Sequence, residues 1–343
     1  MFSIEITYIK TEANSVKTFF FRPNEPFVYE AGQFITLVHN NGLKDLRRNY
    51  SFSSSPHEKD IYSISIKRID NGEFSRWMFD RVKVGDIIQA IGPSGVFTVS
   101  KNIDDANAQL MLVAAGSGIV PVFSIIKDIL DNRPLLKMIL FYSNSSISST
   151  VFLNELEELE KEHPGQLQTE WLFSDNQNLM KARLNKLVLK HLIEAHRKVD
   201  WNNVYVYTCG PFDYMRMVNI VFVNEGLPPA NFRQEQFLDI EPVKVQRRHY
   251  DEKDRTIAIT YRDKTHAVLV PWNLSILDAA LKAGIDLPYS CHAGRCSTCR
   301  CKILSGSIWL HYNEVLTDAD EAAGWSLTCT GHPSSDDLHI SIF

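Results

Sequence analysis

The sequence predicts a multidomain protein in which an antiparallel β-barrel, a parallel α/β domain and a small α+β domain follow one another. Three observations predict this order. Short alternating strands separated by turn residues fill the first hundred residues, as in a small barrel. Strands and helices then alternate from about residue 108, as in an open parallel sheet. The last part carries two alternating strands, a capped helix and four closely grouped cysteines.

Composition and charge limit the possible classes. The 343 residues suffice for two or three domains, and a hydrophobic content of 44% supports packed cores. A net charge of −5 without a basic run argues against nucleic acid as a partner. The N-terminus shows no secretory signal pattern, and no apolar run has the length of a membrane span. We therefore expect a soluble, cytoplasmic and monomeric protein.

The first domain is expected over residues 1–103. Alternating apolar and polar residues predict strands at 3–10, 17–22, 33–38, 62–68 and 86–90. Gly72 to Ser75 stand where a helix is expected to begin, so their backbone amides could bind phosphate. Trp77 follows two residues later, and packing is the favoured interpretation for its side chain.

The second domain is expected over residues 104–238. A strand at 109–115 runs directly into Gly116, Ser117 and Gly118, and a helix at 123–130 and a strand at 136–142 follow. A glycine turn below a helix N-terminus is a place where a dinucleotide pyrophosphate could bind. The full G-x-G-x-x-G pattern is absent, so the turn alone is modest evidence.

Charge density marks the next boundary. Residues 239–255 contain five acidic and five Lys or Arg residues, which predicts a solvated linker. The third domain is expected over residues 256–343, with strands at 256–261 and 267–270. Ser275 is the expected N-cap of a helix that Gly284 ends.

Four cysteines in this third domain carry the strongest chemical signal. Cys291, Cys296, Cys299 and Cys329 are spaced C-x4-C-x2-C with one distant cysteine, which is the ligand spacing of a plant-type [2Fe-2S] cluster. A zinc site or disulfides are the alternatives, but zinc sites favour paired C-x2-C units. Cys301 shares a strand face with Cys299, so we expect a buried structural thiol.

The order of elements in this domain resembles plant-type ferredoxins, which have a β-grasp-like α+β fold, over its whole length. In the first domain, Arg48-Asn-Tyr-Ser51, with the segments at 31–34, 72–75 and 92–97, resembles the flavin domain of the ferredoxin-NADP reductase superfamily. The resemblance implies that Arg48 neutralises the flavin pyrophosphate, that Tyr50 lies along the flavin ring and that Ser51 lies near its N5 atom. The further flavin-binding residues that it implies are Lys67, Gly72, Phe74 and Ser75.

The second domain resembles the pyridine-nucleotide domain of the same superfamily. The motifs are Gly116-Ser-Gly118 and Thr208-Cys-Gly-Pro211. The resemblance implies that Cys209 and Gly210 lie against the nicotinamide and that Thr208 and Pro211 adjoin it, while the alternative for Cys209 is a small buried residue. Ser143, Ser145 and Leu153 offer no cation to a 2′-phosphate, which favours NADH, although NADPH is possible.

The end of the second domain offers two interpretations. Glu235 and Phe237 resemble a Glu-x-Phe segment that lies near the flavin in many relatives, and packing at a helix end is the alternative. The resemblance thus implies that the side chains at the reacting atoms are Tyr50, Ser51, Cys209 and Glu235.

The order of flavin, nucleotide and ferredoxin domains matches a subset of the superfamily. This subset includes the reductases of phthalate dioxygenase, phenylacetyl-CoA epoxidase, ketosteroid hydroxylase and hybrid-cluster proteins. It implies an NAD(P)H oxidoreductase that passes electrons through FAD and a [2Fe-2S] cluster to a separate protein, an oxygenase or hydroxylase component. FMN is the alternative flavin, a hybrid-cluster or other metalloprotein is the alternative acceptor, and a non-catalytic redox sensor is a remote alternative function.

The segment around the cluster cysteines is rich in cations. Arg295, Arg300 and Lys302 predict a basic rim, which would suit an acceptor with carboxylates around its docking point. The alternative is that these cations offset the negative charge of the cluster itself.

Overall fold

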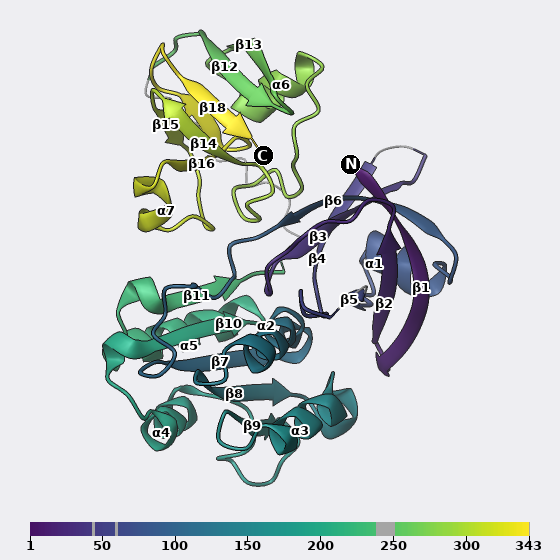
Figure 1. Ribbon diagram of the computed structural model, residues 1–343, viewed down its shortest axis with the longest axis vertical. Helices are drawn as coiled ribbons and strands as arrows, with labels where there is room; N and C mark the ends of the chain where they lie inside the picture. Colours follow the sequence, from purple (N-terminus) through teal and green to yellow (C-terminus); the bar gives the residue numbers. More distant parts are fainter. Residues whose placement is uncertain (43–44, 59–60, 238–250, 343) are drawn as a thin grey trace. The chain divides into compact units, whose positions relative to one another are not determined.

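The computed structural model describes residues 1–42, 45–58, 61–237 and 251–342 (Figure 1). The chain divides into two compact units, of which the first holds residues 1–93 and 97–237 and the second holds the C-terminal part together with residues 94–96. Most of the expected linker, residues 239–250, lies outside the described residues. Among the helices in the described ranges, none is long and apolar enough to cross a membrane.

The N-terminal domain of the first unit is an antiparallel barrel. Its sheet has the strand order β4-β3-β6-β1-β2-β5. A bridge between Phe52 and Ile64 joins the region after β4 to β5 and so connects the two edges of the sheet. Ile35 and Leu37 of β3 belong to the hydrophobic core of this barrel. The strands are β1 (Phe2–Ala13), β2 (Val16–Pro23), β3 (Phe34–Asn40), β4 (Asp45–Ser51), β5 (Tyr62–Lys67) and β6 (Ile87–Ser94), and the helix is α1 (Glu73–Asp80).

The second domain of this unit is a parallel sheet with helices on both faces. The strand order is β11-β10-β7-β8-β9, and every pair is parallel. Helices α2 and α3 pack on one face, and α4 and α5 pack on the other. The strands are β7 (Gln109–Ala115), β8 (Lys137–Asn144), β9 (Leu167–Phe173), β10 (Val204–Cys209) and β11 (Phe232–Glu235), and the helices are α2 (Ile119–Asn132), α3 (Leu153–Glu162), α4 (Lys186–His196) and α5 (Phe212–Asn224).

Helix α2 fastens the parallel sheet to the barrel. The Ser124 hydroxyl donates to the Ser54 carbonyl oxygen at 2.6 Å, and the Lys127 ammonium pairs with the Glu58 carboxylate at 2.6 Å. The first contact is buried, where a polar pair is costly to break, and the second is partly buried. The relative position of the two domains in this unit is therefore held by directed contacts.

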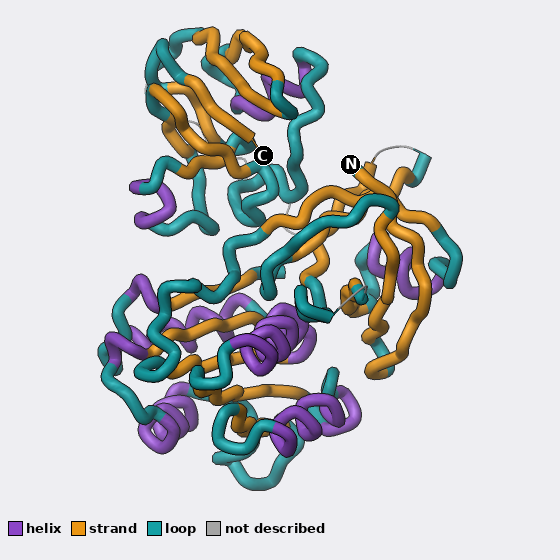
Figure 2. Tube along the Cα trace, in the orientation of Figure 1, coloured by secondary structure: helices purple, strands orange, loops and turns teal. Residues whose placement is uncertain are grey.

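The C-terminal unit is a small mixed sheet with one packed helix (Figure 2). Strand β12 pairs with β13 in a hairpin and lies parallel to β18. The Ser275 hydroxyl accepts from the Asp278 amide and caps α6, as expected, and Gly284 follows that helix with a φ of +80°. The elements are β12 (Arg255–Tyr261), β13 (Lys264–Val270), α6 (Ile276–Lys282), β14 (Arg300–Ser305), β15 (Ile308–Leu310), α7 (Asp318–Ala322), β16 (Trp325–Leu327), β17 (Gly331–Pro333) and β18 (His339–Ile342).

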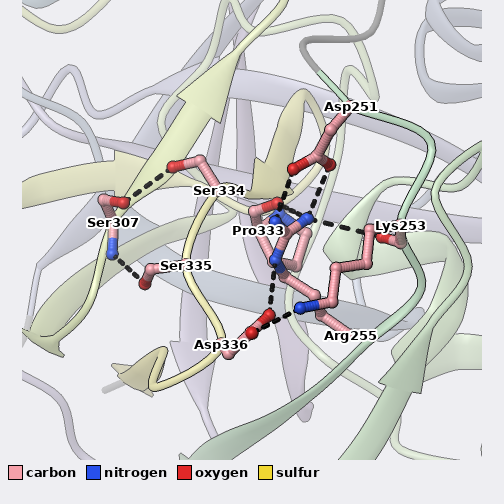
Figure 3. A network of polar contacts seen from close by, with 8 residues as sticks. All are labelled: Asp251, Lys253, Arg255, Ser307, Pro333, Ser334, Ser335 and Asp336. Carbon is pink, nitrogen blue, oxygen red and sulfur yellow. Dashed lines mark hydrogen bonds and ion pairs between the residues drawn. The ribbon is translucent and has the colours of Figure 1, made fainter.

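A buried arginine ties the first residues of this unit to a distant loop (Figure 3). The guanidinium of Arg255 donates two hydrogen bonds to the Asp251 carboxylate, at 2.7 and 2.6 Å, and one to Asp336 at 3.1 Å. Lys253 adds a second contact to Asp336. Only 6% of the Arg255 side chain is exposed. The chain is thus anchored to the domain from Asp251 onward.

The three predicted folds are confirmed, with two differences in detail. Helix α2 begins at Ile119, four residues before the expected start, because the glycine turn leads into it without a break. The segment after Phe232 is strand β11, which pairs in parallel with β10. The alternative that Glu235 packs at a helix end is therefore wrong.

Candidate functional site

Strand β4 presents the flavin motif on both of its faces. Arg48 and Tyr50 lie opposite the buried residues Leu37 and Ile35 of β3, so they share one face, while Ser51 points to the other. The ring of Tyr50 lies 5.8 Å from the ring of Phe74 in α1. Strand β4 and the start of α1 therefore meet, as a shared flavin site requires.

The N-terminus of α1 offers unpaired amides beside this strand. Gly72 is the N-cap residue, and no side chain caps the helix. A Cβ at Gly72 would lie 2.5 Å from the Ser75 hydroxyl oxygen, so a larger residue there would have to displace that hydroxyl. Ser75 is buried, and its hydroxyl donates to the Gly72 carbonyl oxygen at 3.2 Å, which fixes the turn. The first turn also carries Glu73, whose carboxylate accepts from the Asn41 amide group at 2.8 Å, so a phosphate group at these amides would need Arg48 to offset that charge.

Two further residues of the barrel have different surroundings. Trp77 stacks on His39 with ring centroids 3.8 Å apart and an angle of 14° between the planes, in agreement with the packing interpretation. Lys67 is exposed at the end of β5. Within the described ranges, no side-chain contact commits Lys67 to the flavin motif.

Residues from both domains of the first unit meet at Glu235. The Ser51 hydroxyl donates to a Glu235 carboxylate oxygen at 2.8 Å. Glu235 lies opposite Cys209 in the pairing of β11 with β10. Three of the four residues expected at the reacting atoms therefore lie together, namely Ser51, Cys209 and Glu235. Phe237, which was expected near the flavin, is 46% exposed.

The surroundings of Cys209 and Glu235 favour the uncharged forms of their side chains. Desolvation raises the pKa of Glu235 to about 8, although the Ser51 hydroxyl opposes the shift. Burial, and then the charge of Glu235, raise the pKa of Cys209 well above its usual range. The Cys209 thiol is thus held protonated and is no nucleophile. Cys209 stands at the end of β10 and is 0% exposed.

The two nucleotide motifs form one cradle. A Cβ at Gly118 would lie 2.2 Å from the carbonyl oxygen of Cys209, so the loop before α2 touches the loop after β10. A Cβ at Gly210 would meet the Ala115 side chain at 3.0 Å. Between these loops, Thr208 has a fully buried hydroxyl without a partner among the described residues. The short 3-10 turn of Gly116, Ser117 and Gly118 precedes α2 directly.

Charge distinguishes the two helix N-termini at this cradle. Helix α2 has no acidic residue in its first turn, whereas α5, which Pro211 precedes as N-cap, carries Asp213 there. An anion is favoured at a helix N-terminus and disfavoured beside a carboxylate. The cradle therefore holds a pyrophosphate better at α2 than at α5.

Tyr214 is a site residue that the sequence analysis missed. Its hydroxyl donates to the Ala114 carbonyl oxygen at 3.2 Å and lies 3.0 Å from the Ser143 hydroxyl oxygen. It thereby connects the ends of β7 and β8. The signal in the sequence was the position of this aromatic residue, three places after Pro211 and therefore about one turn into α5.

The four cluster cysteines lie together in the second unit. The Cys291 thiol contacts those of Cys296 and Cys329, and the Cys299 thiol contacts that of Cys329. These thiols, followed by the Arg295 and Ala293 amides, lower the pKa of Cys291 to about 2. All six cysteines are free, which excludes the disulfide alternative.

Backbone amides converge on the same sulfurs. The amides of Ala293 and Arg295 donate to the Cys291 sulfur at 3.4 Å, and the Gly294 amide donates to the Cys329 sulfur at 3.4 Å. A φ of +71° at Gly294 lets the loop turn inward. Four thiols ringed by amide donors fit a [2Fe-2S] cluster, whose sulfurs accept hydrogen bonds. Cys301 is buried beside them with a raised pKa, in agreement with a structural role.

The cations near the cluster are already engaged. Arg295 is 12% exposed and pairs with Glu314 at 2.9 Å. Arg300 lies 4.0 Å above the ring of Trp325, and Lys302 bonds to the Ala323 carbonyl at the end of α7. The expected basic rim is therefore wrong for Arg295, because Glu314 compensates its charge.

Three family models match the chain in the order of its domains. The oxidoreductase FAD-binding domain matches residues 3–99, and the oxidoreductase NAD-binding domain matches residues 112–219. The 2Fe-2S iron-sulfur cluster binding domain matches residues 259–334.

Curated relatives extend over nearly the whole chain. The ferredoxin reductase component of 3-ketosteroid-9-alpha-monooxygenase from Rhodococcus rhodochrous is 31% identical over 326 residues, which are 92% of this chain and 88% of that protein. A component of 1,2-phenylacetyl-CoA epoxidase from Escherichia coli is 29% identical, and the match covers 98% of this chain and 96% of that protein. Among solved structures, phthalate dioxygenase reductase has the same fold, with a TM-score of 0.61, 24% identity and coverage of 99% and 98%.

Proposed function

The chain belongs to the family of reductase components that join an FAD-binding, an NAD-binding and a [2Fe-2S] domain, and on this premise we propose that it delivers electrons to an oxygenase. It is an oxidoreductase, and its two curated relatives above are named as components of a monooxygenase and an epoxidase. FAD would accept two electrons as hydride from the nicotinamide and release them singly to the one-electron cluster.

The observation that carries the proposal is the contact between Ser51 and Glu235. It joins the flavin motif of the barrel to the end of the nucleotide sheet, with Cys209 alongside. A flavin on β4 and a nicotinamide on β10 would thus have their reacting rings at one place. Close, ordered reactants need no further side-chain base for hydride transfer.

The chain's own residues would divide the binding work. Arg48 and the first amides of α1 would neutralise the flavin pyrophosphate, and Tyr50 would cover the flavin ring. The nucleotide pyrophosphate would lie on the turn before α2, where Gly210 lets the loop after β10 approach Ala115 closely. Cys291, Cys296, Cys299 and Cys329 would hold the two irons.

NADH is the proposed electron donor. Ser143 faces Tyr214, Ser145 is exposed, and Leu153 opens α3, so these three positions offer hydroxyls and an apolar side chain to the ribose. A 2′-phosphate would find no counter-charge at them.

Reconstitution tests the proposed acceptor. The purified protein would be mixed with NADH and with candidate oxygenase components from the same organism, and substrate oxidation would be measured. We expect turnover that needs all components. If the oxygenase stays unreduced while a hybrid-cluster protein from the same cell is reduced, the acceptor is wrongly assigned.

We also propose a monomer in the cytoplasm. Six free cysteines are typical of a reducing compartment. Light scattering after gel filtration checks the mass against the chain mass of 39.2 kDa, and cell fractionation checks the location.

A further inference from the structure

Five hydroxyl residues stand directly beside the cluster ligands in the sequence, Ser290, Ser297, Thr298, Thr328 and Thr330, and the last four fall into two pairs. Thr298 and Thr328 have partners: the Thr298 hydroxyl oxygen lies 3.4 Å from the Cys296 sulfur, and the Thr328 hydroxyl donates to the Cys299 carbonyl oxygen at 3.2 Å. Ser297 and Thr330 have none within the described part of the chain. Each of these two directly follows a ligand, Cys296 or Cys329.

Thr330 is the more enclosed of the unpartnered pair, with 1% of its surface exposed. A buried hydroxyl without a partner destabilises a fold, so its presence in a native protein calls for an acceptor. No cysteine sulfur accepts from it, although all four ligand sulfurs belong to the described residues. With no acceptor in the described part of the chain, we look to a bound group for the acceptor.

The surroundings of Thr330 fix its side chain beside the cluster loop. Its carbonyl oxygen accepts from the His311 amide at 3.1 Å. Its methyl carbon lies 3.1 Å from where a Cβ of Gly294 would stand, and the Gly294 amide donates to the Cys329 sulfur. The methyl group and the backbone of Thr330 are thus held beside the cluster loop, and the hydroxyl is enclosed with them.

We propose that the Thr330 hydroxyl donates a hydrogen bond to an inorganic sulfide of the [2Fe-2S] cluster and raises its reduction potential. Reduction adds negative charge to the sulfurs, and a donor stabilises that charge. Thr330 would therefore tune the potential at which this chain passes electrons on. The inference rests on the cluster and is independent of the acceptor's identity.

A redox titration of the complete protein tests the proposal. The cluster signal would be followed by electron paramagnetic resonance in Thr330→Val, which keeps the shape and removes the hydroxyl, and in Thr330→Ser, which keeps the hydroxyl. We expect the Val variant to titrate at a more negative potential and the Ser variant to match the wild type. The flavin potential, measured in the same samples, should not move.

Thr260→Val is the control within the same unit. The Thr260 hydroxyl lies 2.9 Å from the Thr265 hydroxyl oxygen and 2.9 Å from His339 Nε2, neither of which belongs to an iron ligand, so we expect an unchanged cluster potential. An unchanged potential in Thr330→Val would overturn the proposal and indicate a buried water as the partner. An equal shift in Thr330→Val and Thr330→Ser would also overturn it, because packing of the methyl group would then be the cause.

Vibrational spectroscopy gives a second measurement. A hydrogen bond to sulfide makes the iron–sulfide Raman bands shift when H2O is replaced by D2O. We expect part of this shift to be lost in Thr330→Val and retained in Thr330→Ser. Thr330→Ala serves the same purpose if the Val variant binds less iron and sulfide than the wild type. A full isotope shift in the hydroxyl-free variant would count against the proposal.

Discussion

Glu235 shows how one half-buried carboxyl group links two domains. Its partner Ser51 is 184 positions away in the chain, and both side chains lose water where β11 meets the barrel. The raised pKa, about 8, means that the carboxyl group is mostly protonated at neutral pH. A neutral acid can accept from Ser51 and still donate a hydrogen bond to a neighbouring ring.

The first prediction is that Glu235 makes stability fall as pH rises. Burial raises its pKa from 4.5 in the unfolded chain to about 8 in the folded one. Between these values the folded state holds the extra proton, so the free energy of unfolding decreases by at most about 1.4 kcal/mol per pH unit. Urea unfolding at pH 5 and pH 8 measures this loss.

Glu235→Gln is the matched variant for this prediction. Gln keeps the shape and an acceptor for Ser51 but cannot titrate. We expect its stability to change less than that of the wild type over the same pH range. Equal pH dependence in both proteins would show that other groups are responsible.

The second prediction concerns the nucleotide. NADH should give a larger kcat/KM than NADPH, because Ser143, Ser145 and Leu153 provide no cation. A preference of about tenfold corresponds to about 1.4 kcal/mol of transition-state binding. Steady-state kinetics with both nucleotides checks it.

The competing outcome for the nucleotide has a structural source. Lys181 and Arg183 are exposed, and the Lys181 carbonyl oxygen accepts from the Phe173 amide at the end of β9. A tenfold preference for NADPH that disappears in Lys181→Ala or Arg183→Ala would show that these cations reach the ribose.

At the scale of elements, the nucleotide cradle depends on two loops that touch. Gly118 leaves no room for a side chain, because the Cys209 carbonyl oxygen occupies that space. The third prediction is that Gly118→Ala separates the loops and destabilises the first unit by about 1–3 kcal/mol. NADH should bind at least tenfold more weakly, as measured by fluorescence or calorimetric titration.

Gly165→Ala is the control for that substitution. Gly165 has a φ of +81°, and no described atom lies within 4 Å of where its Cβ would stand, so it tests backbone strain without a collision. We expect a loss of about 1 kcal/mol and unchanged NADH affinity. Similar losses of NADH affinity in both variants would refute the packing argument.

The fourth prediction concerns the arginine network of Figure 3. Arg255→Ala leaves Asp251 and Asp336 without their shared cation, and we expect the C-terminal unit to lose about 1–3 kcal/mol. Thermal loss of the cluster absorbance measures it, with Lys264→Ala on exposed β13 as control. The flavin signal should be lost at the same temperature as in the wild type. If the wild type, Arg255→Ala and Lys264→Ala all lose the cluster absorbance at the same temperature, the network does not stabilise the unit.

Elements were predictable where the signal was local. The cap at Ser275, the glycine turn before α2 and the cysteine spacing each depend on neighbours within a few residues. Strand β11 was not recognised as a strand, because its pairing with β10 depends on residues some 26 positions earlier in the chain. The network around Arg255 was hidden for the same reason, since Asp336 is 81 positions away and the segment looks like a charged linker.

For the whole molecule, resemblance of motifs predicted the order of domains and cofactors, while contacts between domains came only from the structure. The sequence predicted Ser51, Cys209 and Glu235 one at a time, and the folded chain brings them together. Arg295 shows the opposite case: a cation that looks available in the sequence is compensated by Glu314.

The fifth prediction is that the three cofactors act in series. Cys299→Ser removes one of the four iron ligands, so the cluster should be lost or strongly perturbed while the first unit keeps FAD and the NADH site. NADH-dependent reduction of cytochrome c should fall at least tenfold, because it needs a one-electron donor at the cluster. Ferricyanide can take electrons from the flavin directly, and its reduction should stay within about twofold.

Cys301→Ser is the control for this variant, since Cys301 is buried two residues away and is not a ligand. It should retain two irons and both activities, which iron analysis and the same assays measure. If cytochrome c and ferricyanide reduction fall together in Cys299→Ser while FAD stays bound, the flavin does not work independently of the cluster. A serial path through two separately folded units would then be wrong.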